Sequence, residues 1–451
     1  MGIRAAGSSS PSQIAEKVIE MEKLPLKQLE VRKKKIQDEQ KVFKELSTLV
    51  NGLNSSIGQL KSKKDFYKLK LESSSPDIID GSVTIDAPVG SYEVEVQQLA
   101  KSHKLLTKSF PDKDKTSLGF GYLRLELDDG SSVDIDIDPS KSTLQEVSQQ
   151  INDASKDIKA YVLKTKENIE LDGEDGYRLL VFSEKTGKQA KIFIDNDMLY
   201  SDFHEKVTAK NLKILFEDVP IYDETNSVKD ILPGMSLTAK RSEPGLKVEI
   251  KVDYDVDKTF ESIKTFVENY NKFNDFIEKQ FQVDPETQRA GPLAYDNTLR
   301  TLKNSLRGPL QGQHYHKILG DFGVTTDPKN GNLKLDEAKI KKALSDDYVG
   351  VARFFIETRE HSGLGNELQK TLKSITDLSS GPIASRDRQF KRQITEVDKS
   401  YDQQQRFFDQ KSASIKRRFT QLEQFLGQMN NQSQVMQAKL GGGAPQDPSG
   451  S

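Results

Sequence analysis

The chain has 451 residues, and its 67 basic and 69 acidic side chains leave a net charge of −2, which gives no general bias toward nucleic acid or an anionic membrane. It contains no cysteine, which excludes disulfides, thiolate metal sites and cysteine nucleophiles. A chain of this length is expected to contain about three domains. Charged residues make up 30% of it and hydrophobic ones only 34%, a balance that suits an elongated molecule with much surface.

The first residues carry no apolar stretch of the kind that a secretory signal peptide needs, and no segment of the chain approaches the roughly 18 apolar residues of a membrane span. Ser10, Pro11 and Gln13 form a helix start, with Ser10 as the cap and Gln13 completing a capping box. The short helix that follows should break near Pro25, because proline cannot donate the backbone bond that continues a helix.

A long helix is expected from there to about Lys70. Its first core position recurs every seven residues, which keeps one apolar seam on one face of a helix. These residues are Leu29, Ile36, Phe43, Val50 and Ile57. The second core position is apolar at Leu46, Leu53 and Leu60 but polar at Arg32 and Glu39, so the seam is incomplete near its start.

The apolar period changes to two between about residues 77 and 254, which predicts a β-rich block. Alternating segments include 83–85, 92–96, 123–127, 133–137, 179–182, 192–194, 212–216 and 248–252. Asp129-Gly130 is a hairpin signal between two of them. One helix, Leu144 to Ala154 with Thr143 or Ser142 as its cap, interrupts the strands.

Helical periodicity returns at Phe260 to Ile277. Further helices are expected around 299–306, 336–344, 348–356 and 364–378. Gly381-Pro382 ends that block, and a last helix of roughly 80 Å should start near Ser385. Residues 441–451 are rich in Gly, Pro and Ser and are expected to be disordered.

The last helix repeats the heptad pattern of the first. Its first core position holds Ile394, Tyr401, Phe408, Ile415, Leu422, Met429 and Met436. Its second core position is apolar at Phe390, Val397 and Phe425 and polar at Gln404, Lys411 and Arg418. Two matching seams at opposite ends of the chain predict mutual pairing. Alternate polar core positions bury little apolar surface, so the distal ends should need other subunits, although an ordinary self-sufficient coiled coil is the simpler alternative.

We therefore predict a partner interface on the terminal helices and no catalytic, cofactor or metal site. The interface residues are Leu29, Ile36, Phe43, Ile394, Tyr401, Phe408, Ile415, Leu422, Met429 and Met436.

Catalytic and metal-binding alternatives find little support. His314 and His316 could share a strand face but have no further ligand at zinc spacing. Asp134, Asp136 and Asp138 alternate with isoleucines, which favours a half-exposed strand over a calcium loop. The sequence has no G-x-x-x-x-G-K-[ST] phosphate loop and no G-x-S-x-G elbow, so we interpret the chain as non-enzymatic.

Four stretches of the chain carry a family resemblance. They are Ile19-Glu20-Met21-Glu22-Lys23-Leu24-Pro25-Leu26, the strand 90–100 (Gly-Ser-Tyr-Glu-Val-Glu-Val-Gln-Gln-Leu-Ala), Phe266-Val267-Glu268-Asn269-Tyr270-Asn271, and Gly331-Asn332-Leu333-Lys334-Leu335-Asp336. In their order and spacing they resemble the flagellar filament caps, or hook-associated protein 2 family. Residues 143–152 and 177–187 also look like a module that flagellins and caps share. The segment 8–13 departs from the opening usual in that family.

The resemblance implies an α+β multidomain fold, with terminal coiled-coil helices and a helical bundle as legs and an inserted β-rich head of two subdomains. The expected divisions are legs at 1–45 and 385–451, a bundle at 46–72 and 255–384, one head subdomain at 73–108 and 210–254, and an outer one at 109–209 with the flagellin-like module.

It further implies a ring-shaped homo-oligomer at the distal filament tip that promotes flagellin folding and insertion and prevents flagellin leakage. Its other implied partners are flagellin, the hook-filament junction proteins, the flagellar type III export apparatus and an export chaperone. The protein would then be extracellular, exported without a cleaved signal peptide. The alternative is a surface adhesin that binds host or prey glycans through the head.

Overall fold

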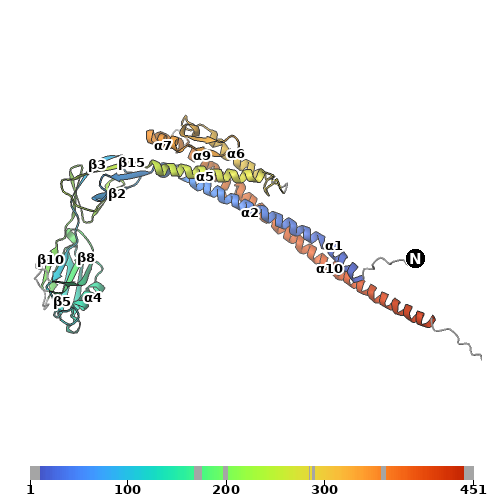
Figure 1. Cartoon of the computed structure of the whole chain (residues 1–451), viewed down its shortest axis with the longest axis horizontal. Coiled ribbons are helices and arrows are strands. Elements are labelled where there is room, and N and C mark those ends of the chain that lie inside the picture. The colour runs from blue at the N-terminus through green and yellow to red at the C-terminus, as the bar shows by residue number, and fades with distance from the viewer. Residues whose placement is uncertain are drawn as a thin grey trace, which may run out of the picture. The chain divides into compact units, whose positions relative to one another are not determined.

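The computed structural model describes residues 11–166, 175–196, 202–283, 285–286, 290–356 and 362–440. The chain divides into two compact units, a helical unit of Met1–Ser62 with Phe260–Ser451 and a β unit of Lys63–Thr259 (Figure 1). The expected α+β fold with terminal helices and an inserted β-rich part is confirmed. The cap at Ser10 and the disorder predicted for 441–451 lie outside the described residues.

Three helices form the long part of the helical unit. They are α1 (Pro11–Glu22), α2 (Leu24–Gly58) and α10 (Pro382–Leu440). The expected break near Pro25 is only a one-residue turn at Lys23, because the Lys23 N–H still bonds to the Ile19 carbonyl and Pro25 stands in the first helical turn, where no N–H is needed. Figure 1 shows α1 and α2 running along α10, which confirms that the two ends of the chain pair with each other.

The rest of the helical unit packs against α2 and α10 around a phenylalanine-rich core. Its elements are α5 (Val256–Phe281), α6 (Asn297–Gln311), η3 (Leu319–Phe322), β16 (Val324–Thr326), β17 (Leu333–Leu335), α7 (Glu337–Asp346), α8 (Tyr348–Phe355) and α9 (Leu364–Thr376). All five helices of this block lie where the apolar periodicity predicts them. Buried Phe266, Phe273, Phe354 and Phe355 fill the space between them.

Asn271 joins two of the stretches that carry the family resemblance. Its side-chain amide donates to the Leu333 carbonyl at 2.8 Å, and its amide oxygen accepts from the Leu333 N–H at 2.8 Å. Nearby, the Asn274 amide donates to the Asn330 carbonyl at 2.8 Å. These asparagines therefore satisfy the backbone of the β16–β17 hairpin from the face of α5.

The helix expected to reach about Lys70 is shorter than predicted. It ends at Gly58, a one-turn helix α3 (Lys63–Phe66) follows, and Leu69–Ser73 is strand β1. A long-range pairing accounts for the strand at the end of the predicted helix, since β1 lies antiparallel to β15 (Lys247–Tyr254) with Leu71 opposite Val252. The domain divisions expected from the sequence stay a prediction.

The β unit contains two separate hydrophobic cores. The first lies between a five-stranded sheet of order β1-β15-β3-β11-β12 and a three-stranded sheet of order β13-β14-β2. The strands not yet given are β2 (Ile79–Val83), β3 (Gly90–Gln98), β11 (Leu212–Phe216), β12 (Val219–Asp223), β13 (Ser227–Leu232) and β14 (Met235–Ala239). Val94 and Val96 of β3, Ile214 of β11 and Ile250 of β15 are fully buried there.

The second core lies between a four-stranded sheet of order β10-β4-β8-β7, a three-stranded sheet of order β6-β5-β9, and helix α4. These elements are β4 (Lys104–Thr107), β5 (Gly121–Leu127), β6 (Ser132–Ile137), η1 (Pro139–Lys141), α4 (Leu144–Ala154), β7 (Ile158–Thr165), β8 (Gly176–Ser183), η2 (Lys188–Ala190), β9 (Ile192–Asn196) and β10 (Phe203–Val207). Helix α4 has the predicted bounds, and Thr143 with Glu146 forms its capping box. Gly130 turns the predicted hairpin with a φ of 85°, which an L side chain rarely adopts.

Candidate interaction surface on the terminal helices

Helices α2 and α10 form an antiparallel coil whose register is set by contacts along its length. At the inner end the Phe43 and Phe390 rings meet edge to face with centroids 5.7 Å apart. Further out, Lys33 pairs with Asp398 at 2.6 Å. At the outer end, in α1, the Ser12 N–H donates to Glu423 at 3.1 Å. The chain therefore pairs its ends from Phe43 out to Ser12.

The residues predicted at the first core position occupy three different environments. Ile36 and Phe43 are buried. Leu29, Ile394, Tyr401, Phe408 and Ile415 are half-buried within the coil. Leu422, Met429 and Met436 are exposed, with 63% of Met436 accessible. The structure thus brings the first seven together in the coil and leaves the last three exposed, with Leu422 at the outer end of the coil and Met429 and Met436 beyond it.

Burial on α10 falls from the inner to the outer end of the coil, while Leu26 and Ala15 of the N-terminal helices stay buried. Leu46, Leu53, Phe390 and Val397 at the inner end are buried. Toward the outer end the facing residues are joined by exposed polar contacts, such as Lys411 with Glu22 at 2.7 Å. Surface ion pairs of this kind contribute only about 0–1 kcal/mol each. The outer part of the coil is therefore held much less firmly than the inner part.

Two polar contacts along the coil shift the pKa values of their members. The Tyr401 hydroxyl donates to a Glu30 carboxylate oxygen at 3.0 Å, which raises the pKa of the phenol because the hydrogen-bonded neutral form is favoured. Lys391 bonds to Asp387 and lowers the pKa of that carboxyl, and the Gln40 amide on α2 adds to this at 3.2 Å. The Asp387 carboxylate therefore remains ionised at neutral pH.

The start of α10 is fixed by the turn before it. The Asp377 carboxylate accepts the N–H and hydroxyl groups of Ser379 and Ser380, which lowers the pKa of Asp377. A Cβ on Gly381 would lie 2.5 Å from the Asp377 carbonyl oxygen, so only glycine fits there. This turn sets the direction of α10, which runs back along α2.

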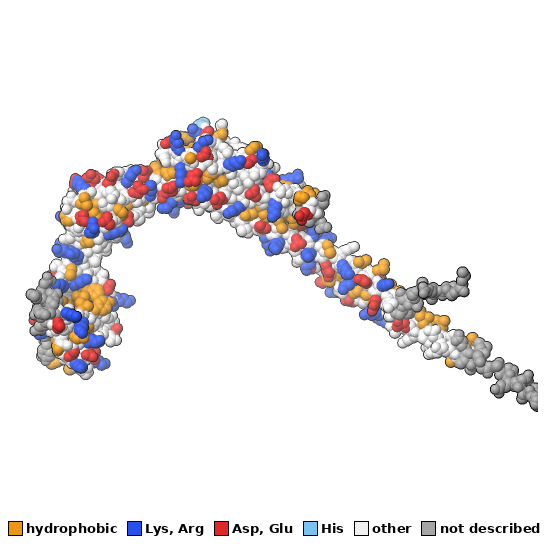
Figure 2. Space-filling model, in the orientation of Figure 1, with side chains coloured by type: hydrophobic (Ala, Val, Ile, Leu, Met, Phe, Trp, Pro, Cys, Tyr) orange, Lys and Arg blue, Asp and Glu red, His pale blue; other side chains and the backbone are white. Residues whose placement is uncertain are grey.

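From Leu422 onward, α10 continues as a helix with an exposed apolar stripe, which we call the tail stripe. It consists of Leu422, Phe425, Leu426, Met429, Val435 and Met436. The sequence from Gln424 to Ala438 has no charged residue. In Figure 2 the end of α10 accordingly shows orange patches among white and few blue or red side chains. The stripe continues the seam of the coil past the start of α1 at Pro11.

A second exposed apolar surface, which the sequence reading missed, lies on α1 and α2. Ile14, Met21, Leu24 and Val31 are all exposed, and we call them the outer track. Their positions differ from those of the seam residues Ala15, Leu26 and Ile36, which are buried. The seven-residue intervals from Ile14 to Met21 and from Leu24 to Val31 were the signal that could have revealed it.

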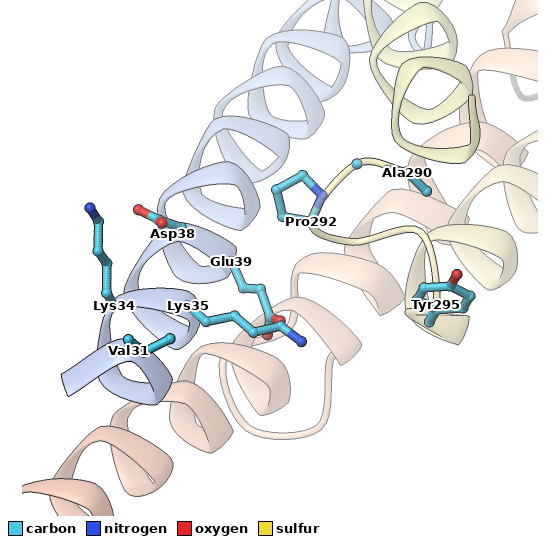
Figure 3. Close-up of a pocket in the computed structure, with 9 residues that line it drawn as sticks. Val31, Lys34, Lys35, Asp38, Glu39, Ala290, Pro292 and Tyr295 are labelled. Carbon is cyan, nitrogen blue, oxygen red and sulfur yellow. The ribbon is translucent and has the colours of Figure 1, made fainter. Parts of the chain in front are cut away.

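The outer track ends in a groove of ≈ 640 Å³ between α2 and the chain that connects α5 to α6. Figure 3 shows Lys35 and Glu39 extending from α2 toward the segment with Pro292 and Tyr295, while Lys34 and Asp38 point away from it. The Tyr295 side chain is 94% exposed. Two lysines and two carboxylates at the rim leave the groove with no net charge.

Metal-binding geometry is not found in the described parts of the chain. They contain no group of three or more His, Cys, Asp or Glu side chains that could hold a metal ion. His314 is buried against the Phe354 ring, and His316 has a left-handed backbone, so the two histidines do not share a strand face. Asp134 and Asp136 lie on β6, as the strand reading predicts. No described helix combines the length and the apolarity needed to cross a bilayer.

Comparison with known proteins gives consistent matches. Residues 10–103 match the family model of the flagellar hook-associated protein 2 N-terminus, and residues 209–431 match that of its C-terminus. The B-type flagellar hook-associated protein 2 of Pseudomonas aeruginosa PAO1 is 27% identical over 385 residues, which cover 78% of this chain and 79% of the relative. Flagellar hook-associated protein 2 of Escherichia coli K12 is 24% identical, covering 83% and 84%.

The fold has a counterpart among solved structures. The crystal structure of the D1-D2-D3 domains of the flagellar cap protein FliD from Escherichia coli superposes with a TM-score of 0.61 and 23% identity, covering 77% of this chain and 99% of that one.

Proposed function

The chain belongs to the flagellar hook-associated protein 2 family, and we propose that it caps the growing flagellar filament as a ring of several copies. In this role it promotes the folding and insertion of flagellin subunits at the distal tip and prevents their escape into the medium. It reaches the tip through the flagellar type III export channel, with an export chaperone and without a cleaved signal peptide. The comparisons do not favour the alternative of a surface adhesin.

The single observation that supports an assembly role most is the tail stripe. The end of α10 exposes six large apolar side chains, five of them in the uncharged segment from Gln424 to Ala438. This is unfavourable in water, where each such side chain would gain roughly 1.5–3 kcal/mol on full burial. Because the stripe continues a seam that the chain itself pairs further in, it is built to be completed by another chain. We therefore assign the terminal helices, including the ten predicted seam residues, to contacts with other copies and with flagellin.

The difference between the buried inner end and the exposed outer end of the coil also supports this function. A leg that shifts when each new flagellin enters must be anchored at one end and free to open at the other. The buried inner contacts of Phe43 and Phe390 provide the anchor, and the exposed ion pairs of the outer end open at little cost.

The test is a strain that lacks the gene for this chain. Cells complemented with the full chain should carry filaments of normal length, whereas uncomplemented cells should release unpolymerised flagellin into the medium. Cells with normal filaments in the absence of the chain would refute the proposal. A chain that restores filaments only when its residues 419–440 are present would support the role of the tail stripe.

A further inference from the structure

The chain carries two unpartnered apolar surfaces that match in length. Along the outer track, Ile14 and Val31 are separated by about 25 Å of helix at 1.5 Å per residue. On the tail stripe, Leu422 and Met436 are separated by about 21 Å. Each is a helix face with apolar residues at heptad intervals, and two such faces pack together as in a coiled coil.

The groove extends the outer track with the exposed aromatic side chain of Tyr295, which lies on a segment that is anchored on both sides. Tyr295 precedes Asp296, whose carboxylate accepts the Thr298 N–H to cap α6 and pairs with Arg386 of α10 at 2.7 Å. The Gly291 N–H bonds to the Gln280 carbonyl at 3.1 Å, which anchors the other side of the segment. An exposed tyrosine on an anchored backbone segment is the kind of residue that dominates binding energy at protein interfaces.

Charge favours the tail stripe as the occupant. The groove is neutral overall, with lysines and carboxylates at its rim, so it offers no net attraction to a strongly charged segment. The segment from Gln424 to Ala438 is uncharged and presents glutamines and asparagines beside its apolar residues. Those amides can bond to lysine and carboxylate side chains without leaving a charge unpaired.

The tail stripe of a chain cannot reach the groove of the same chain. Asp387 of α10 accepts a hydrogen bond from Gln40, next to the groove residue Glu39. From Asp387 to Leu422, α10 is one continuous helix, and this places Leu422 about 50 Å away. Residues 1–10 have only Met1 and Ile3 as large apolar side chains, too few to cover the stripe.

We infer that the tail stripe of one copy docks on the outer track and groove of a second copy, with Phe425 or Met429 against Tyr295. The contact joins two different surfaces, so it is heterologous and continues from copy to copy until a ring closes. This inference rests on the proposed function, because it names the chain that completes the tail stripe within a cap of several copies.

The test uses a fluorescent synthetic peptide of residues 419–440 and the purified full chain. In the receptor chain Phe425→Glu disables the tail and leaves the outer track intact. We expect saturable binding of the peptide by fluorescence anisotropy. Adding Tyr295→Glu should weaken binding at least tenfold. Adding Tyr222→Glu, at a tyrosine of the β unit that is also exposed, should leave binding unchanged.

Three results would overturn the inference: no saturable binding to the Phe425→Glu chain, equal binding after Tyr295→Glu, or equal weakening by Tyr222→Glu. Binding to the unmodified chain but not to the Phe425→Glu chain would show that tails pair with tails instead. As a second measurement, a photoreactive benzoylphenylalanine at position 295 should crosslink to residues 419–440 of an isotope-labelled copy. Crosslinks to any other segment would contradict the inference. If these binding tests fail while cells that express the full chain carry normal filaments, the inference is wrong and the cap function stands.

Discussion

Replacing Phe390 with alanine should destabilise the helical unit by about 4 kcal/mol. Phe390 is fully buried, its ring contacts Phe43, and the Arg386 guanidinium lies 4.5 Å from its ring centroid. Core Phe→Ala substitutions cost roughly 3–5 kcal/mol, more where the surroundings cannot collapse into the cavity. Here Arg386 is held by its ion pair with Asp296, so we expect little collapse and a value in the middle of that range or above.

The assay is urea unfolding followed by circular dichroism at 222 nm, which reports mainly on the helical unit. The matched control is Phe407→Ala on the same helix, because the Phe407 side chain is 54% exposed and its loss should cost less than about 1 kcal/mol. The reasoning would be refuted if the two variants lowered the free energy of unfolding equally. It would also be refuted if Phe390→Ala lowered it by less than about 1 kcal/mol, since the inner end of the coil would then not be its anchor.

Three further predictions concern the seam and the β unit. Phe408→Asp places a charge in the half-buried part of the coil. We expect the variant chain to be exported normally, but the cells should lack filaments and release flagellin into the medium. Electron microscopy of the cells and immunoblots of the medium will show this. The buried His103 ring accepts the Ile192 N–H at 3.0 Å, and burial lowers the pKa of this histidine. Its contribution to stability is therefore complete above the unfolded pKa of about 6.5 and lost as the pH falls below it. The urea midpoint of the β unit should thus drop as the pH falls below about 6.5, and less so in His103→Gln. Gly187→Ala should cost at least about 2 kcal/mol, because the φ of Gly187 is 95° and an added Cβ would lie 2.8 Å from the backbone of the facing turn. Gly130 has open space around it, so Gly130→Ala should cost only the backbone strain. Equal shifts of the melting temperature for both variants would contradict this.

Local signals in the sequence were sufficient where a neighbouring residue decides the structure. Helix α4 has its predicted bounds because Thr143 and Glu146 satisfy the first backbone N–H groups within one turn. The heptads likewise predicted that α2 and α10 pair, since a seam of that period needs a helical partner. The register of the coil did not follow from the heptads, because it depends on side chains such as Gln40 and Asp387 that meet across 347 positions.

Structure that depends on distant segments could not be predicted in this way. The last residues of the predicted helix instead form β1, which pairs with β15 far along the chain. The groove forms because the segment at Pro292 and Tyr295 approaches α2, and no local pattern marks that approach. Sequence reading therefore identified the apolar seam that lies within one helix and missed the groove that two separate segments build.

The coil combines firm and weak parts in an order that matters for assembly. If the outer end were as apolar as the inner end, each chain would bury its own tail, and no surface would be left for a neighbour. If the inner end were as polar as the outer end, at Lys411 and Arg418, the ordering of two long helices would not be offset by burial. A subunit that must fold alone and still bind its neighbours needs both ends. The decrease in burial from Phe390 to Met436 provides them within one continuous helix.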